Sequence, residues 1–253
     1  MRSCRQRVAN RPCTHNFTIG ASFQHCLGGL FNRCFLLIAR PPDRYLYPTE
    51  WSPSQLFRLG QPVLTIASGN PHKVREIERM LGPLPVVVMR QPDDLDVEET
   101  GSTYLENAQL KAEAAALRTG TWTLADDSGL EVDALGGAPG LFTARFAASN
   151  VDKIAKLLEA LQGDPYRSAC FRSAMVLCSP QGECVDQAEG VCWGELLSSP
   201  AYPDAGIESL FWVREARCSY GELNDSQLAR LGSRGKAARA LAPQLRKRLG
   251  LTD

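Results

Sequence analysis

Segments with strand periodicity alternate with segments of helical periodicity from Val63 onward, and this alternation restricts the chain to folds in which helices flank a sheet. We predict strands at 63–67, 85–89, 122–125, 169–178 and 183–188, further strands at 192–197 and 210–213, and helices at 72–81, 103–118, 151–161 and 233–249. Residues 169–178 and 183–188 are separated by a short polar turn, which predicts an antiparallel hairpin. The fold class is therefore α/β, with a mixed central sheet and flanking helices.

The first sixty residues differ in composition from the rest. They contain eight arginines, no lysine, one aspartate and one glutamate, so they carry +6 while residues 61–253 carry −6. This composition is typical of a transit peptide, and equally of translated upstream sequence behind a wrongly assigned start. A shorter start would need a non-AUG codon near Val63, because Met80 lies inside a predicted helix. We expect 1–60 to be a disordered, transit-like or mis-assigned extension and 61–253 to be the functional domain.

Composition excludes several classes of function. No apolar run approaches the roughly 18 residues that cross a membrane, and the mildly acidic body argues against a broad nucleic-acid surface. The nine cysteines are widely spaced without a C-x-x-C pair, and only three histidines are present, which disfavours zinc. Cys170, Cys178, Cys184 and Cys192 fall in predicted strands, where a thiol packs as a small apolar residue. We expect a cytoplasmic protein in a reducing compartment, without a membrane or nucleic-acid partner.

The segment LADDSGLEVDALGGAPG, residues 124–140, is the most informative for chemistry. A short apolar strand leads into two adjacent carboxylates, Asp126 and Asp127, followed by the hydroxyl of Ser128. Carboxylates at the carboxyl end of a strand commonly hold a metal or a reacting water in α/β proteins. Consecutive strand residues point to opposite faces, so the two aspartates should have different partners. A polar turn closing a hairpin is the alternative, since Asp, Ser and Gly are ordinary turn residues.

The segment Ser68-Gly69-Asn70-Pro71-His72-Lys73 lies where the first predicted strand turns into a helix. Glycine permits close backbone approach, the amides of a helix N-terminus favour an anion, and Lys73 adds a positive charge. These features suit a small phosphate cradle, although the glycine spacing is not that of a P-loop. The alternative is a capped helix with a solvated lysine.

Further polar residues precede and follow the second predicted helix. Glu98 and Glu99 form an acidic pair in the loop ahead of it, where such pairs usually face solvent. Asn107 and Lys111 are four residues apart and share a helical face, and a surface polar pair is the default interpretation. Arg145 follows the glycine-rich loop and is either a surface residue or a phosphate clamp.

Taken in order, three motifs resemble the inosine/xanthosine triphosphate pyrophosphatase family: S-G-N-x-x-K, E-E-T-G-x-T-x-x-E-N-A-x-x-K-A and A-D-D-S-G-L-x-V-D-A-L-G-G-A-P-G. The similarity is dense from about Leu64 to Phe146, weaker to Leu249, and leaves 1–60 uncovered. It implies an elongated, two-lobed domain around a cleft, a homodimer, and Mg²⁺-dependent hydrolysis of a nucleoside triphosphate to the monophosphate and pyrophosphate. Bacterial members remove aberrant purine nucleotides from the pool.

The resemblance also implies roles for individual residues. Asp127 becomes the proton acceptor and a metal ligand, with Glu98 as the acidic partner at the Mg²⁺ and Asp126 in support. Mg²⁺ prefers hard oxygen ligands and keeps several waters, which suits carboxylates. The implied substrate-binding residues are Ser68, Gly69, Asn70, Lys73, Lys111, Ser128, Arg145, Glu208 and Arg234.

The C-terminal third departs from the family pattern. Where the family has G-F-G-Y-D-P, this chain has residues 204–209, so that Ala205 replaces the Phe that stacks on the purine and Ile207 replaces the Tyr. The base-contacting His of S-H-R-G becomes Ser233. A lysine expected shortly before it aligns with Leu228.

These losses concentrate on the base pocket and leave the phosphate and metal half intact. Glu208 stands for the family Asp, and Trp193 or Trp212 could supply a replacement stacking surface. Loss of one base–aromatic stack is worth roughly 1–3 kcal/mol. We therefore expect changed selectivity or weaker substrate binding. A pyrophosphatase with altered nucleotide selectivity and a nucleotide-binding protein without efficient turnover both remain alternatives.

Overall fold

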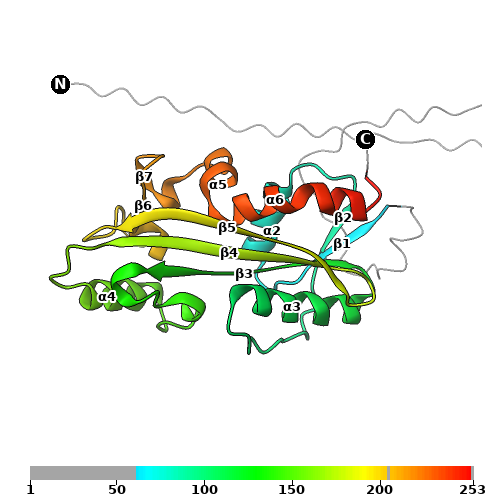
Figure 1. The fold of residues 1–253 in the computed structure, drawn as a ribbon, viewed down its shortest axis with the longest axis horizontal. Helices are drawn as coiled ribbons and strands as arrows, with labels where there is room; N and C mark the ends of the chain where they lie inside the picture. Colours follow the sequence, from blue (N-terminus) through cyan, green and yellow to red (C-terminus); the bar gives the residue numbers. More distant parts are fainter. Residues whose placement is uncertain (1–60, 204–205, 252–253) are drawn as a thin grey trace, which may run out of the picture. The chain divides into compact units, whose positions relative to one another are not determined.

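The structure is a computed structural model that describes residues 61–203 and 206–251. The predicted extension at 1–60 lies outside the described residues. Within them, seven strands form one mixed sheet in the order β2-β1-β3-β4-β5-β6-β7 (Figure 1). The strands are β1 (Val63–Ile66), β2 (Val87–Arg90), β3 (Trp122–Val132), β4 (Ser168–Cys178), β5 (Cys184–Leu196), β6 (Phe211–Val213) and β7 (Cys218–Ser219). Pairing is parallel between β1 and its neighbours β2 and β3, and antiparallel from β3 to β7, which confirms the mixed α/β class.

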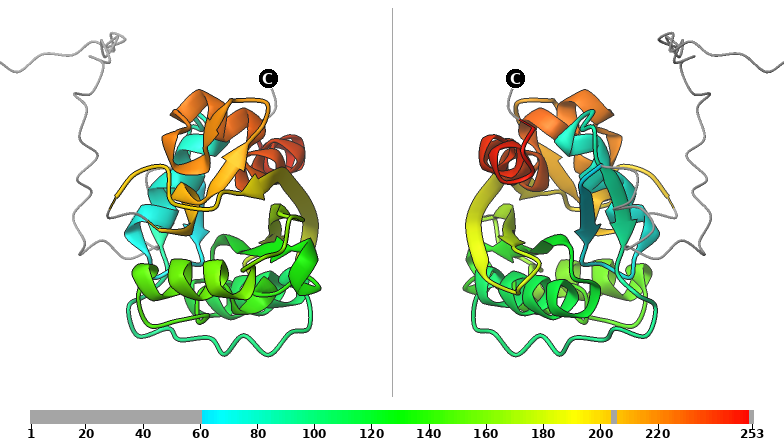
Figure 2. Two further views of the ribbon diagram at one scale, coloured as in Figure 1. Left: turned by 90° about the vertical axis from the view of Figure 1, so that its left-hand side faces the viewer. Right: turned by 90° about the vertical axis from the view of Figure 1, so that its right-hand side faces the viewer.

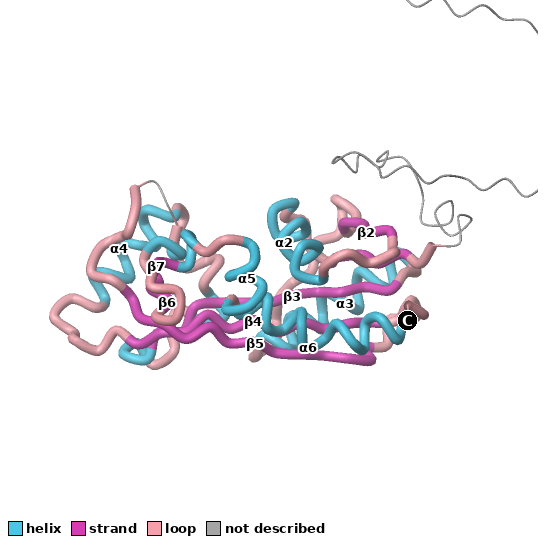
Figure 3. Tube along the Cα trace, turned by 90° about the horizontal axis from the view of Figure 1, so that it is seen from above, coloured by secondary structure: helices cyan, strands magenta, loops and turns pink. Residues whose placement is uncertain are grey.

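Helices cover both faces of this sheet. They are α2 (Pro71–Leu81), α3 (Tyr104–Thr119), α4 (Asn150–Ala160), α5 (Asp225–Leu231) and α6 (Ser233–Arg248). In Figure 1, α3 and α4 lie below the sheet and α2, α5 and α6 lie above it. Seen from above, α6 runs along β4 and β5 (Figure 3). None of the helices in the described part of the chain combines the length and the apolar character that crossing a membrane requires.

Strand β3 is longer than its sequence predicts. We expected it to end at Ala125, with the two aspartates just beyond its carboxyl end, but it continues to Val132 and pairs with β4 over its whole length after Trp122. The aspartates are therefore inside a strand. They nevertheless lie beyond the end of the neighbouring strand β1, because β1 stops at Ile66, which pairs with Leu124. One edge of β3 is thus left without a parallel partner where the aspartates begin.

Two apolar cores pack on the same face of β3, separated by a polar interval. Leu124 belongs to a core with residues of α2 and α6, whereas Leu130 and Val132 belong to a second core with residues of α4 and β6. Asp126 and Ser128 occupy the positions between them on that face. Figure 2 shows β4 and β5 curving between the part of the sheet near α3 and α4 and the part near α2 and α6. The polar positions Asp126 and Ser128 therefore mark the boundary between the two apolar cores along β3.

Alanines allow α3 to approach the opposite face of the sheet closely. Ala108, Ala112 and Ala115 are fully buried against Ala125 and the neighbouring strand. Gly129 is required at the N-terminal end of this contact, because a Cβ there would lie 2.7 Å from the hydroxyl of Tyr104 and collide with the backbone oxygen of Gly140. Gly129 therefore lets α3 and the loop that contains Gly140 pack onto β3.

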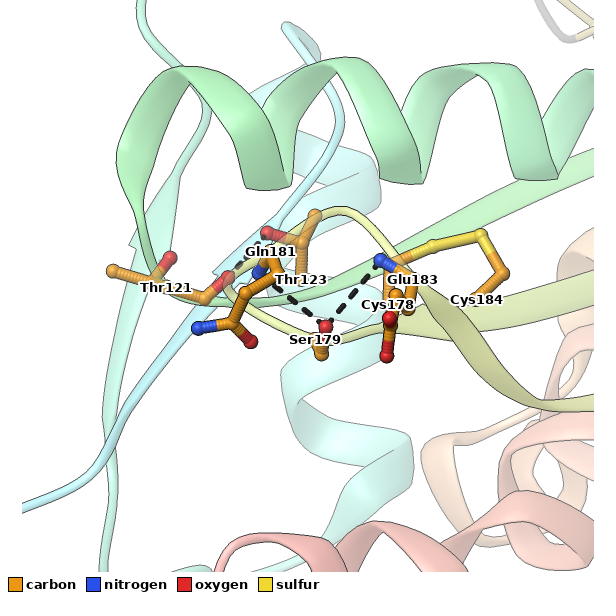
Figure 4. Close-up of a disulfide and its surroundings, with 7 residues drawn as sticks. All are labelled: Thr121, Thr123, Cys178, Ser179, Gln181, Glu183 and Cys184. Atoms are coloured by element: carbon orange, nitrogen blue, oxygen red, sulfur yellow. Dashed lines mark hydrogen bonds between the residues drawn. A yellow bond between two sulfur atoms is a disulfide. The ribbon is translucent and has the colours of Figure 1, made fainter.

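A disulfide between Cys178 and Cys184 closes the β4–β5 hairpin (Figure 4). The prediction of packed thiols was wrong for this pair, and the structure keeps Cys170 and Cys192 as buried free thiols. The register shifts between Leu177 and Cys178, and the turn brings the two Cα atoms of the disulfide to 3.9 Å. The spacing of these cysteines could not reveal that shift.

Candidate active site

The loop after β1 ends in the N-cap of α2, Asn70, as in the capped helix that the sequence offered as an alternative. Asn70 accepts hydrogen bonds through Oδ1 from the amides of His72 at 2.9 Å and Lys73 at 3.4 Å. Gly69 is exposed, and nothing lies within 4 Å of where its Cβ would stand. The side chain of Lys73 is not solvated as the alternative would have it: Nζ lies 2.8 Å from Asp126 Oδ2. The loop therefore presents open backbone beside a lysine that is directed at the central carboxylates.

Asp126 is held by two cations on the face of β3 that carries the two cores. Its Oδ2 atom accepts hydrogen bonds from Lys73 and from Arg234 Nε, the latter at 3.0 Å. Its Oδ1 atom is buried and has no hydrogen-bond partner within the described residues. Burial alone would raise the pKa of Asp126, but the charges of Arg234 and Lys73 outweigh it and lower the pKa to about 2. Asp126 is therefore an ionised carboxylate with one oxygen still able to accept a ligand.

Arg234, in the first turn of α6, joins three elements. Its guanidinium donates to Asp126, to Glu76 Oε2 of α2 at 2.7 Å and to Ser128 Oγ at 2.7 Å. Burial lowers the pKa of Arg234, yet attraction to Asp126 and Glu76 outweighs that effect and raises it. Glu76 was missed from the sequence, although it follows Lys73 by three residues and so shares its helical face.

Asp127 points to the opposite face, and its partners differ from those of Asp126, as predicted. Its Oδ1 atom accepts from Lys111 Nζ at 2.9 Å and its Oδ2 atom from Asn107 Nδ2 at 3.3 Å. Asn107 is only 1% exposed, so the default interpretation of a surface pair was wrong. Burial lowers the pKa of Lys111, but the charge of Asp127 and the hydrogen bond to Glu99 raise it above its ordinary value.

Glu99, rather than Glu98, joins this network. Its carboxylate accepts from Lys111 Nζ at 2.7 Å and lies 3.6 Å from Arg145 Nη2. Burial raises the pKa of Glu99, but its hydrogen bond and ion pair with Lys111 outweigh this and lower it. Glu98 is exposed, and its side chain makes no hydrogen bond or ion pair within the described residues. Adjacent residues in an extended loop point in different directions, and sequence could not tell which of the two faces inward.

Two cavities meet beside Lys73. The smaller, 320 Å³, is lined by the loop after β1 together with Glu99, Lys111 and Asp126. The larger, 480 Å³, is lined by Ser128 and Arg234 and by residues from α4, β4 and the segment before β6. Asn70 and Lys73 line both. An elongated ligand could therefore extend from one cavity to the other past Lys73.

The residues that depart from the family pattern lie around the larger cavity. Ile207 lines it but is 7% exposed and packs in a core. Glu208 also lines it, and its Oε1 atom accepts from the amide of Gly206 at 3.0 Å. The hydroxyl of Ser233 lies 2.9 Å from that of Ser173. Ala205 lies outside the described residues.

Neither tryptophan considered as a stacking surface lines the larger cavity within the described residues. Trp193 lies on β5 with 62% of its surface exposed, and Trp212 lies on β6. The benzene rings in the lining belong to Phe171 and Tyr220 instead. Sequence analysis missed both, because each reads as an ordinary core aromatic residue.

The carboxylates fit a divalent metal that is completed by its substrate. The described residues hold no cluster of three or more His, Cys, Asp or Glu side chains that would form a cage. Mg²⁺ is commonly bound by one or two carboxylates together with phosphate oxygens and waters. Asp126, which lines the smaller cavity and has an unpartnered Oδ1 atom, and the nearby Glu99 and Asp127 could supply such ligands.

Comparison with known proteins agrees with this geometry. A dITP/XTP pyrophosphatase from Synechococcus sp. (strain CC9311) is 43% identical over 188 residues, covering 74% of this chain and 91% of that protein. Among solved structures, a HAM1 protein from Coxiella burnetii is similar with a TM-score of 0.67 and 34% identity, over 74% of this chain and all of that one. A nucleoside-triphosphatase / dITP/XTP pyrophosphatase from Mycobacterium abscessus gives 0.57 and 34%, over 72% of this chain and 98% of that one. The model of the Ham1 family matches residues 64–244, and the chain belongs to this family.

Proposed function

We propose that this chain is a hydrolase that converts inosine and xanthosine triphosphates, as ribo- or deoxyribonucleotides, to the monophosphate and pyrophosphate, with Mg²⁺ as cofactor. The observation that carries the proposal is the pair of adjacent carboxylates, each held by a lysine, with Asp126 in the lining of the smaller of two adjoining cavities. The names of the relatives support the same activity.

The triphosphate occupies the smaller cavity in this proposal. Its charge is offset by Lys73, Lys111 and Arg145, which surround Glu99 and the two aspartates. Asn70 already caps two amides of α2, so the backbone at Gly69 and the hydroxyl of Ser68 remain for phosphate oxygens. Ser128 and Arg234 then lie on the side of the larger cavity, which takes the nucleoside.

Asp127 accepts the proton of the attacking water in this proposal. The water oxygen bonds to the α-phosphorus, the bond from that phosphorus to the bridging oxygen breaks, and pyrophosphate leaves. Lys111 holds Asp127 in place and, once a phosphate oxygen is near, can share its protons with that oxygen instead. Mg²⁺, when bound by Asp126, Asp127 and an acidic side chain of the 98–99 loop, supplies charge neutralisation and polarisation of the water.

Substitution of Asp127 tests the mechanism. Asp127→Asn keeps the shape of the side chain but removes its charge and the base, so kcat for inosine triphosphate should fall about 10²- to 10⁴-fold. Pyrophosphate release is measured with Mg²⁺ on inosine, xanthosine, guanosine and adenosine triphosphates, using the full chain. Asp133→Asn is the matched control, an exposed carboxylate just after β3. Full turnover by a folded Asp127→Asn protein would contradict the mechanism.

The altered base pocket supports a second candidate within the same chemistry, a pyrophosphatase for a different nucleotide. Ile207 and Ser233 offer the base less polar recognition than the family Tyr and His. Turnover in which inosine and xanthosine triphosphates do not stand out would favour it. Tight binding without pyrophosphate release would favour a nucleotide-binding role.

We further propose that residues 61–253 act as a homodimer in the cytoplasm, with no nucleic-acid or membrane partner. Light scattering of the purified chain, which gives the molar mass of the assembly, tests the dimer. A mass of one chain at enzyme-assay concentration would contradict it.

A further inference from the structure

We propose that Phe171 and Tyr220 form the surface on which the nucleobase stacks. This inference rests on the proposed function and assigns to the larger cavity a recognition surface that replaces the missing family aromatic residue. Two observations support it. Among the described residues, Phe171 and Tyr220 have the only benzene rings in the lining of the larger cavity, and their position relative to the carboxylates suits a nucleotide.

The register of β3 and β4 places Phe171 at the correct end of the site. Ser173 pairs with Ser128, and Phe171 pairs with Leu130, four residues along β3 from Asp126. At about 3.4 Å per residue, Phe171 stands roughly 14 Å from Asp126 along the strand. Its side chain lies on the same face as Asp126 and Ser128, because residues two apart share a face. A nucleotide with its phosphates at Asp126 therefore extends its base toward Phe171.

Tyr220 completes this surface from a different element. Its ring centroid lies 4.9 Å from that of Phe171, with the planes at 48°. Tyr220 lies inside a capping box, in which the carboxylate of Glu222 accepts hydrogen bonds from the amide and the hydroxyl of Ser219. A Cβ at Gly232 would come within 2.9 Å of the Tyr220 hydroxyl, so the turn before α6 needs glycine to make room for it. The backbone thus fixes Tyr220, and a fixed ring loses little entropy when a base stacks on it.

Two polar side chains in the lining of the larger cavity, Ser233 and Glu208, already have partners within the chain. Ser233 shares a hydrogen bond with Ser173, and the Oε1 atom of Glu208 accepts from the amide of Gly206. Stacking is tolerant of the base, because every base has a π-face. Stacking in this pocket should therefore favour the larger surface of a purine over that of a pyrimidine.

The experiment separates the base from the phosphates. Pyrophosphate release from inosine triphosphate gives KM and kcat, and inhibition by inorganic tripolyphosphate reports the phosphate half alone. Phe171→Leu and Tyr220→Leu should each raise KM for inosine triphosphate about 5- to 150-fold, with kcat nearly unchanged and the tripolyphosphate inhibition constant unchanged. Phe171→Tyr and Tyr220→Phe keep the rings and should retain KM. Trp193→Leu removes an exposed aromatic residue outside the cavity and is the matched control.

Each outcome decides the inference. An unchanged KM in folded Phe171→Leu and Tyr220→Leu proteins overturns it, and so does a parallel loss of tripolyphosphate inhibition, which would show a structural effect. If one leucine variant does not fold, the other leucine variant is compared with the variant that keeps the ring at the same position, and the KM values of these two proteins decide the inference. If the unmodified chain releases no pyrophosphate, the proposed function fails, and calorimetric binding of inosine triphosphate to the same variants still tests the stacking surface.

Discussion

The half of the site proposed to bind phosphates and the half proposed to bind the base, called the phosphate half and the base half, are built from different interactions. Around Asp126 and Asp127, charged groups are arranged in pairs and every cation contacts a carboxylate, as Lys73, Lys111 and Arg234 do. Around the larger cavity, Ile207 packs in an apolar core and Ser233 makes a neutral hydrogen bond with Ser173. A buried charge cannot be exchanged without leaving its partner unpaired, whereas an apolar wall can be rebuilt residue by residue. This difference explains why the sequence diverges in one half and not in the other.

The largest effect expected from this contrast is on Arg234. Arg234→Met leaves the buried carboxylate of Asp126 with Lys73 as its single cationic partner and should lower the free energy of unfolding by about 3–5 kcal/mol. Urea denaturation followed by circular dichroism measures the change. Arg239→Met, an exposed arginine on the same helix, should change stability far less. Equal losses in the two variants would show that the ion network contributes no more than a surface charge.

Acid should weaken the phosphate half through Asp126. The pKa of this group is about 2 in the folded chain against an ordinary value of 3.8, so it contributes stability above pH 3.8 that is lost as the pH falls toward 2. The contribution is roughly 2 kcal/mol. Unfolding measured between pH 5 and pH 2 should show a smaller acid dependence in Asp126→Asn than in the unmodified chain. An identical pH profile would mean that Asp126 is not held ionised by its neighbours.

The base half should give the smallest effect. Ser233→Ala removes one buried neutral hydrogen bond and should cost about 1 kcal/mol of unfolding free energy. Ser173→Ala should cost the same, and the double variant should be less destabilised than the sum, because both single changes break one bond. Losses that add fully would contradict the contact between the two hydroxyls.

Local patterns could predict the parts of the fold that depend on neighbours in sequence. The different partners of Asp126 and Asp127 follow from strand alternation alone and are confirmed, and the cap at Asn70 belongs to the capped helix that the sequence offered as an alternative. The continuation of β3 to Val132 could not be predicted, because Asp, Ser and Gly favour turns until β4 pairs along them. Propensity was overridden there by a long antiparallel partner.

The candidate site was predictable in its central residues but not in their partners. Asn107 and Lys111 share a helical face, yet only the sheet shows that this face is the buried one. Glu99 and Glu98 are equivalent in composition, and the choice between them depends on the path of a loop. Phe171 and Tyr220 come together across about fifty residues of chain. Contacts between distant segments carry no local signal, which is why these residues were missed.

The polar interval on β3 has a mechanical consequence. Between Leu124 and Leu130 the strand face lacks the apolar packing that stiffens it on both sides, and Asp126 and Ser128 are braced there by the side chain of Arg234. We therefore expect a movement of one core relative to the other to bend strands β3, β4 and β5 mainly in this section. Hydrogen exchange at the amides of residues 126–128 should slow when a nucleotide binds. Such slowing would show that binding stiffens this section of the strands.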